Sequence, residues 1–231
     1  MTSHTARRRI TPADWLVPAG LIALSLVPIA AGAARVSQLA GGAAITADNV
    51  RFFDSPIPVI AHIVGSSVYL LLGAMQFSPA LRRRAWHRRA GRIAAPAGLV
   101  SALSAIWMTL FYDLPSSVTG PGLSAIRLVL ATAMIGAIVA AVVAIRHGDV
   151  PRHRAWMTRA YAIGLGAGTQ VLVLLPWTVF IGTPGPVVYT VLMGAGWAIN
   201  LVVAEVAIRR AGGRTASRSP HRPETAGARL S

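Results

Sequence analysis

The sequence contains no cysteine and no lysine, and only seven of its 231 residues are acidic. The absence of cysteine excludes disulfide bonds, thiolate metal ligands and a cysteine nucleophile. Charged residues make up 13% of the chain, well below the ~25% that is usual in soluble domains. A soluble globular class is therefore excluded, and a hydrophobic content of 54% excludes a disordered chain as well.

Arginine supplies all 22 basic residues and gives the chain a net charge of +15. These arginines fall in short blocks between long apolar runs. Such a pattern is typical of a membrane protein, whereas a nucleic-acid-binding domain would carry its basic residues on a polar surface. We therefore expect no nucleic-acid partner, and we expect anionic lipid headgroups to meet the basic blocks.

Six apolar runs are each long enough to cross the hydrocarbon core of a bilayer, which takes about 20 helical residues. The runs cover residues 15–34, 57–81, 93–112, 123–145, 156–181 and 187–208. They are apolar nearly all round, whereas a helix at the surface of a soluble protein would carry a polar stripe. We predict an all-α membrane bundle of six transmembrane helices over 15–208, after an N-terminal segment (1–14) and before a disordered tail (211–231).

The arginines also predict the orientation of the bundle. With the N-terminus in the cytoplasm, 19 arginines lie inside and only Arg35, Arg51 and Arg127 lie outside, as the positive-inside rule requires. The net charge is then +15 inside and 0 outside. We predict cytoplasmic termini in a multi-pass protein of the bacterial inner (plasma) membrane, since a basic set made of arginine alone suggests a GC-rich bacterial genome.

The first run has a second interpretation. Basic residues, an apolar stretch and the small residues of 30–34 also resemble a secretory signal with its cleavage site. We favour a retained helix, because the run has no polar segment before the small residues and contains two prolines, Pro18 and Pro28.

Polar groups inside a bilayer are costly, so each one is a candidate functional residue. His62 lies near the start of the second run. A helical wheel aligns it with the small and polar residues Gly65, Ser66, Tyr69, Gly73 and Gln76. Such a face serves close helix packing, which we favour, or forms a ligand groove.

The fifth and sixth runs carry the other intramembrane polar residues. Gln170 would lie about 16 Å deeper in the membrane than Arg159, at 1.5 Å per residue. Asn200 and Glu205 lie in the sixth run, about 140° apart around the axis. Glu205 pairs with Arg209, four residues on, or across helices with Arg159.

Two predicted cytoplasmic loops each place a His-Arg pair before a helix. The two corners comprise His87, Arg88 and Arg92, and His153, Arg154, Trp156 and Arg159. They are ordinary positive-inside charge, or they hold an anion, a lipid headgroup or a haem propionate. The candidate haem ligands are His62, His87 and His153. His62 and His87 would be about 37 Å apart along a helix and cannot share one iron, whereas His87 and His153 could meet only at the cytoplasmic edge.

The sequence has no phosphate-binding loop, dinucleotide-binding glycine motif, zinc-protease motif, EF-hand loop or GxSxG. We therefore expect no enzymatic activity. Three functions stay open. The chain binds or moves a small molecule or lipid through a polar face formed by the helices of the second, fifth and sixth runs, or it is a redox protein that binds haem or quinone, or it is a structural or assembly factor.

A set of spaced motifs runs through nearly the whole chain up to Glu205. They read Phe52-Phe53-x-Ser55-Pro56-x-Pro58-x-x-x-His62-Ile63, Leu72-Gly73-x-x-Gln76-Phe77, Leu81-Arg82, His87-Arg88, Gly91-Arg92, His153-Arg154-x-Trp156-Met157-x-Arg159-x-Tyr161 and Trp197-x-x-Asn200-Leu201-x-x-Ala204-Glu205. In these motifs the chain resembles the DUF2306 family of predicted bacterial membrane proteins of unknown function. The resemblance implies a retained first helix and no particular activity. The family often has Arg where this chain has Gln170.

Overall fold

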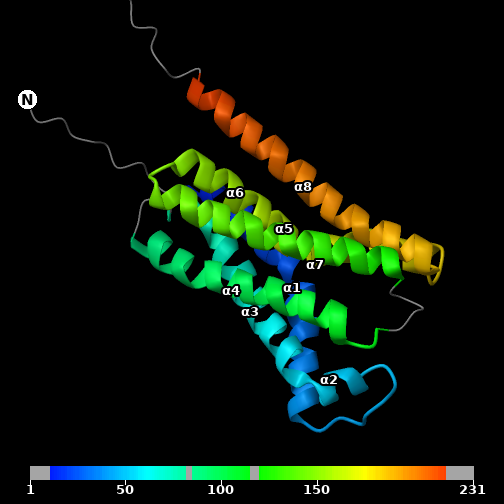
Figure 1. The fold of residues 1–231 in the computed structure, drawn as a ribbon. Helices are drawn as coiled ribbons and strands as arrows, with labels where there is room; N and C mark the ends of the chain where they lie inside the picture. Colours follow the sequence, from blue (N-terminus) through cyan, green and yellow to red (C-terminus); the bar gives the residue numbers. More distant parts are fainter. Residues whose placement is uncertain (1–10, 82–84, 115–119, 217–231) are drawn as a thin grey trace, which may run out of the picture.

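The protein is described here by a computed structural model that covers residues 11–81, 85–114 and 120–216. These residues form helices joined by turns, with no strand among them. The helices are α1 (Ala13–Ala40), α2 (Val50–Asp54), α3 (Pro56–Gln76), α4 (Ala85–Phe111), α5 (Pro121–Arg146), α6 (Val150–Gly164), α7 (Gly166–Phe180) and α8 (Pro186–Ala216). Figure 1 shows them as one bundle.

The bundle has the lengths and the apolar surface of a membrane protein. Helices α1, α3, α4, α5 and α8 are each long and apolar enough to cross a bilayer. Large apolar side chains such as Leu16, Val129 and Val202 lie exposed on these helices, as expected for surfaces that face lipid. The predicted all-helical membrane fold is confirmed. The number of spans is five, or six if α6 and α7 form one bent span.

The fifth predicted helix is interrupted. In place of one helix over 156–181, α6 begins at Val150 and ends at Gly164, and α7 follows from Gly166 with its axis bent by 42°. Leu165 lies between the two helices. Three glycines surround it, Gly164, Gly166 and Gly168, and glycine is a poor helix former, by about 1 kcal/mol relative to alanine.

The observed ends of the other helices differ from the apolar runs for simple reasons. Helix α3 ends at Gln76 and not at 81, because Pro79 disfavours a helical conformation at Ser78. Helix α4 begins at Ala85 and not at 93. The arginines and alanines of 85–92 are good helix formers, so the helix extends beyond the apolar run. Helix α8 runs to Ala216, so part of the predicted disordered tail is helical. Residues 217–231 and 1–10 lie outside the described residues.

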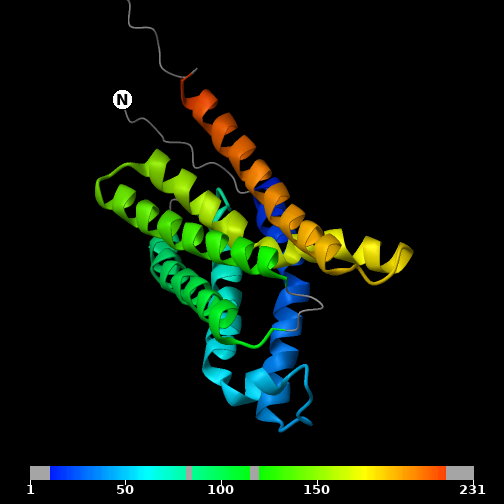
Figure 2. The same cartoon turned by 45° about the vertical axis from the view of Figure 1, so that its right-hand side comes forward.

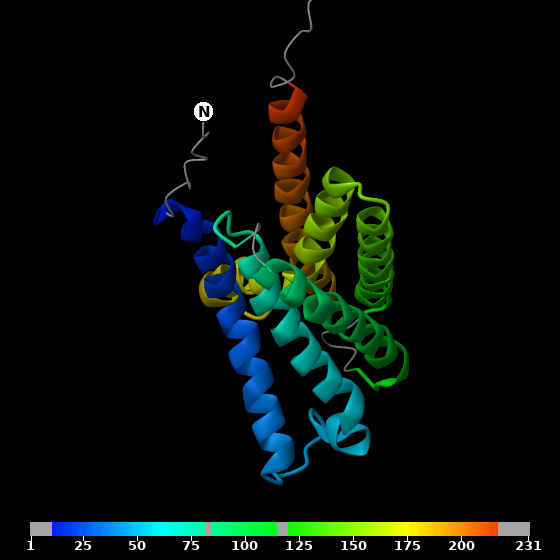
Figure 3. The same ribbon diagram turned by 90° about the vertical axis from the view of Figure 1, so that its left-hand side faces the viewer.

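The helices share two ends. Helix α1 begins and α8 ends at the same end of the bundle as the α3–α4 and α5–α6 connections, and we call this the terminal end (Figures 1 and 3). Helix α2 and the α4–α5 connection lie toward the opposite end, which we call the α2 end. The turn between α7 and α8 projects to the side of the bundle (Figure 2).

The core forms where α3, α4, α5 and α6 meet. The ring of Tyr69 is buried there, and a Cβ added at Gly98 on α4 or at Gly164 on α6 would lie 2.8 Å from it. In the same way, Gly73 on α3 accommodates the ring of Tyr161. Glycines therefore let the helices approach closely around two tyrosines. Much of the small and polar face predicted on the second run serves packing.

Candidate functional site

A cavity of about 420 Å³ lies inside the bundle, with walls from all of the described helices. Its volume is within the ~300–1,000 Å³ typical of small-molecule sites. Most of its lining is apolar, including Ile29, Leu130 and Met134. Two of the predicted polar residues, His62 on α3 and Gln170 on α7, lie on its walls. The structure therefore brings them to one cavity from separate helices.

His62 is held by α4. Its Nδ1 lies 2.9 Å from the carbonyl oxygen of Ser101 and 3.3 Å from Oγ of Ser104. Because a carbonyl oxygen can only accept, Nδ1 carries the proton, and Nε2 is the acceptor nitrogen of the neutral ring. His62 can thus accept a hydrogen bond from a ligand. A metal-binding histidine is oriented in the same way.

The break between α6 and α7 lies beside the cavity, whose lining includes Ile163, Gly164 and Ala167. Side chains of α8 donate hydrogen bonds to two backbone carbonyls in the last turn of α6. Asn200 Nδ2 donates to the carbonyl of Ala162 at 3.2 Å, and Trp197 Nε1 donates to that of Ile163 at 3.1 Å. Thr169, on the far side of the break, donates to Asn200 Oδ1 at 2.6 Å. A single asparagine therefore joins α8 to both sides of the break. In a bilayer, the polar groups at a helix break need such partners within the protein.

Glycines let α7 and α8 come this close. A Cβ at Gly166 would overlap the indole of Trp197, and a Cβ at Gly196 would lie 2.7 Å from the side chain of Gln170. Gln170 donates from Nε2 to the carbonyl of Met193 at 3.1 Å. It is therefore part of the α7–α8 contact as well as of the cavity wall.

Gln76 lies away from the cavity. Its Nε2 donates to the backbone carbonyl of His87 at 3.3 Å and so links the last turn of α3 to the first turn of α4. The connection between α3 and α4 lies at the terminal end of the bundle (Figure 1). Gln76 thus fixes a connection between helices.

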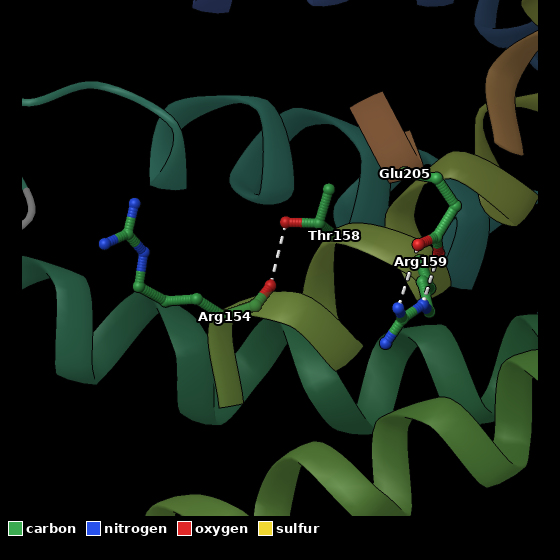
Figure 4. A network of polar contacts seen from close by, with 4 residues as sticks. All are labelled: Arg154, Thr158, Arg159 and Glu205. Carbon is green, nitrogen blue, oxygen red and sulfur yellow. Dashed lines mark hydrogen bonds and ion pairs between the residues drawn. The ribbon is translucent and has the colours of Figure 1, made fainter. Parts of the chain in front are cut away.

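Arg159 and Glu205 form a two-pronged ion pair between α6 and α8 (Figure 4). Arg159 Nε donates to Glu205 Oε1, and Nη2 donates to Oε2 at 3.0 Å. The guanidinium of Arg159 also lies 4.9 Å from the ring of Trp156. Of the two partners considered for Glu205, the structure thus has the one on the other helix. The side chains are 30% and 36% exposed, and neither lines the cavity.

The two His-Arg corners lie on helices and not before them. His153 Nδ1 donates to the carbonyl of Ala141 at 2.9 Å and ties α6 to α5. Arg154 points away from the Arg159–Glu205 pair (Figure 4). Arg154 is exposed, as are Arg88 and Arg92.

The candidate haem ligands have contacts in different places. Only His62 of the three lines the cavity, His153 contacts α5, and the carbonyl of His87 contacts α3. Within the described residues, no three histidine or acidic side chains come together as a metal site.

The sequence alone did not show what several residues of this region do. The contacts of Trp197 and Thr169 depend on the helix break, which the sequence does not reveal. Gly164 and Gly168 form a small-xxx-small pair, which indicates close packing but not a break. The spacing Trp197-x-x-Asn200 is the signal that could have found the α8 contacts, because it places two side-chain donors about one helical turn apart.

Comparisons with known proteins place most of this region in one family. A family model described as "Predicted membrane protein (DUF2306)" matches residues 59–208, which run from α3 into α8. No curated protein and no solved structure matches the chain. The matched segment contains His62, the helix break and the Arg159–Glu205 pair.

Proposed function

Because the chain belongs to the DUF2306 family of predicted membrane proteins, whose description names no activity, we propose that this multi-pass membrane protein binds a small, mostly apolar molecule in the cavity of its bundle. The observation that carries the proposal is the cavity itself. Its volume of about 420 Å³ suits a small ligand. His62 and Gln170 are placed on its walls to orient a ligand that the apolar lining holds.

His62 supplies the polar contact of the proposed site. Its Nε2 can accept a hydrogen bond from a ligand that carries a hydroxyl or amide donor. Burial of the apolar part of the ligand supplies most of the affinity, because apolar contact area is the main favourable component of such binding. The cavity and its lining support a binding function.

We also propose that the terminal end faces the cytoplasm of a bacterial cell and that the protein lies in the inner membrane. The described arginines at the terminal end are Arg88, Arg89, Arg92, Arg146, Arg152, Arg154, Arg209 and Arg210. Such an excess marks the cytoplasmic side. A phosphatase that is active only outside the cytoplasm should stay inactive when fused after Ser231, and a fluorescent protein fused there should fluoresce. The reverse result would contradict this orientation.

The chain contains its own reporters of ligand binding. Met108, Met134 and Met193 line the cavity from three helices, whereas Met75 and Met157 do not. The test uses protein with ¹³C-labelled methionine methyl groups, held in phosphatidylcholine nanodiscs and titrated with dodecanol, a neutral single-chain donor. Saturable shifts of the three cavity methyls, with the other two unmoved, are expected.

Two matched alanine substitutions control the experiment. Ala167 and Ala133 are both exposed on helices, but only Ala167 lines the cavity. Ala167→Leu should abolish the saturable shifts, and Ala133→Leu should leave them unchanged. His62→Ala should weaken dodecanol binding about two- to tenfold, the usual net value of one hydrogen bond.

Two other results would favour the competing functions. Equal, non-saturating shifts of all five methyls would mean that dodecanol only partitions into the bilayer, and the binding proposal would fail in favour of a structural role. A haem absorption band that appears on expression with haem supply and disappears in His62→Ala would favour a redox function.

A further inference from the structure

The α2 end of the cavity gathers three arginines. Arg127 on α5 lines the cavity directly. The guanidinium groups of Arg35 and Arg51 lie 4.6 and 4.5 Å from the ring centre of Phe52, which is itself part of the cavity wall. Arg35 also follows the cavity-lining Gly32 by about one turn of α1, so both belong to the same helix face.

These arginines are the exceptions to the charge distribution of the chain. All of the other described arginines lie at the terminal end or in the first turns of α6. In a protein that places its arginines on one side, three on the other side need a separate reason. Each of the three lies on the cavity wall or against a residue of that wall: Arg127 lines the cavity, and Arg35 and Arg51 contact Phe52.

These arginines have acidic residues on the same side of the protein but no direct ion pair within the described residues. Three acidic residues, Asp48, Asp54 and Asp113, lie toward this end and are exposed, and in the part of the chain that the structure describes none of them forms an ion pair with Arg35, Arg51 or Arg127. The undescribed segment 115–119 contains no charged residue. Arg51 Nε is buried without a hydrogen-bond partner. Burying a charged donor without an anionic partner costs free energy, unless a ligand accepts its hydrogen bond.

The lining of the cavity changes from this end to its interior. Arg127 and the aromatic rings of Phe52 and Tyr112 form the wall at the α2 end, with Arg35 and Arg51 against the Phe52 ring, whereas the interior wall beside the helix break is mostly apolar and includes Ile163 and Met134. A site that is cationic at one end and apolar at the other matches a molecule that is acidic at one end and apolar at the other.

On the basis of the proposed function, we infer that the ligand is a single-chain amphiphile with an acidic headgroup, which Arg35, Arg51 and Arg127 hold at the α2 end while its chain fills the cavity. Arginine suits this role because its planar fork binds carboxylate and phosphate oxygens with two parallel hydrogen bonds. A volume near the lower end of the small-ligand range suits one chain and not the two tails of a phospholipid.

The methionine methyl titration can separate the headgroup from the chain. The probes are dodecanoate, dodecyl phosphate, dodecanol and inorganic phosphate, each added to protein in phosphatidylcholine nanodiscs at a pH that keeps the carboxyl ionised. The two acids should bind at least about tenfold more tightly than dodecanol, since one charge-assisted hydrogen bond contributes this much. Inorganic phosphate alone should leave the cavity methyls unmoved.

Matched variants test the arginines. Arg127→Gln and Arg51→Gln should each lower dodecanoate affinity about tenfold and leave dodecanol affinity unchanged. Arg146→Gln, at the other end of α5, should change neither. Dodecanol binding shows whether the cavity is folded in each variant, so a misfolded variant would bind neither dodecanol nor dodecanoate. If Arg127→Gln misfolds, Arg127→Lys is a milder change that should retain part of the preference for acids.

Each contrary result has a distinct meaning. Equal affinities for dodecanoate and dodecanol would overturn the acidic headgroup and leave the proposed function standing. An acid preference that survives in both glutamine variants would overturn the assignment to these arginines. Inorganic phosphate that binds as tightly as dodecyl phosphate would overturn the requirement for a chain. Binding of no probe would refute the proposed function itself.

Discussion

Asn200 should hold the helix break together, and removal of its side-chain amide should destabilise the protein more than its size suggests. Its Nδ2 donates to the Ala162 carbonyl at 3.2 Å and its Oδ1 accepts from Thr169 at 2.6 Å. Asn200→Leu conserves most of the volume and removes both bonds. The neighbouring Ile199 is exposed, so Ile199→Leu is the matched control.

The expected magnitude follows from the two bonds. Side-chain hydrogen bonds between membrane helices contribute about 0.6 kcal/mol on average and at most about 1.7. Loss of two bonds should therefore cost about 1–3 kcal/mol, and Thr169→Val, which removes only the shorter bond, about 0.6–1.7 kcal/mol. Because both variants break the same Thr169–Asn200 bond, the double variant should be no less stable than Asn200→Leu alone.

Reversible unfolding in mixed detergent micelles, followed by circular dichroism as a denaturing detergent is added, measures these differences. The reasoning would be refuted if Asn200→Leu were as stable as Ile199→Leu. Strict additivity of the two single variants would refute the shared bond and leave the Ala162 contact as the only role of Asn200.

Two further predictions concern contacts of α8. Gly166→Ala should destabilise the protein by about 1–3 kcal/mol in the same unfolding assay, because the added methyl overlaps Trp197. Gly136→Ala is the control and should be neutral or slightly stabilising, because nothing lies within 4 Å of the added methyl. Equal changes in stability for the two variants would contradict the close contact between Gly166 and Trp197. Glu205→Gln should cost less than about 1 kcal/mol, since its ion pair with Arg159 is partly exposed; a loss that does not shrink at high salt would contradict this account.

The sequence alone could predict the all-helical membrane fold and the approximate positions of most helices, for a physical reason. Long apolar runs are necessary for a helix to cross a bilayer, so length and hydropathy locate the spans. The ends are less certain because helices continue through polar turns: α4 includes Arg88 and Arg92, and α8 extends to Ala216. Hydropathy indicates which residues lie in the hydrocarbon core, whereas the position of a helix end depends on local backbone hydrogen bonds.

The helix break was not predictable from hydropathy, because the residues around Leu165 are as apolar as the rest of their run. Only the partner helix shows that a break is tolerated there, through Trp197 and Asn200. In the same way, His62 and Gln170 are both candidates in the sequence, but a common cavity depends on how α3 and α7 pack. Periodicity places a residue on a face and does not say which helix lies opposite that face.

The structure divides the intramembrane polar residues into two groups, and this division decides which variants are informative. Asn200 and Glu205 complete bonds to α6, and Gln76 links α3 to α4, so their loss should act through stability. His62 has an acceptor nitrogen that its contact with Ser101 leaves open, and Arg127 lines the same cavity without a carboxylate partner among the described residues. A phenotype caused by an Asn200 variant would therefore not identify a ligand site, whereas a phenotype of Arg127→Gln with unchanged stability would.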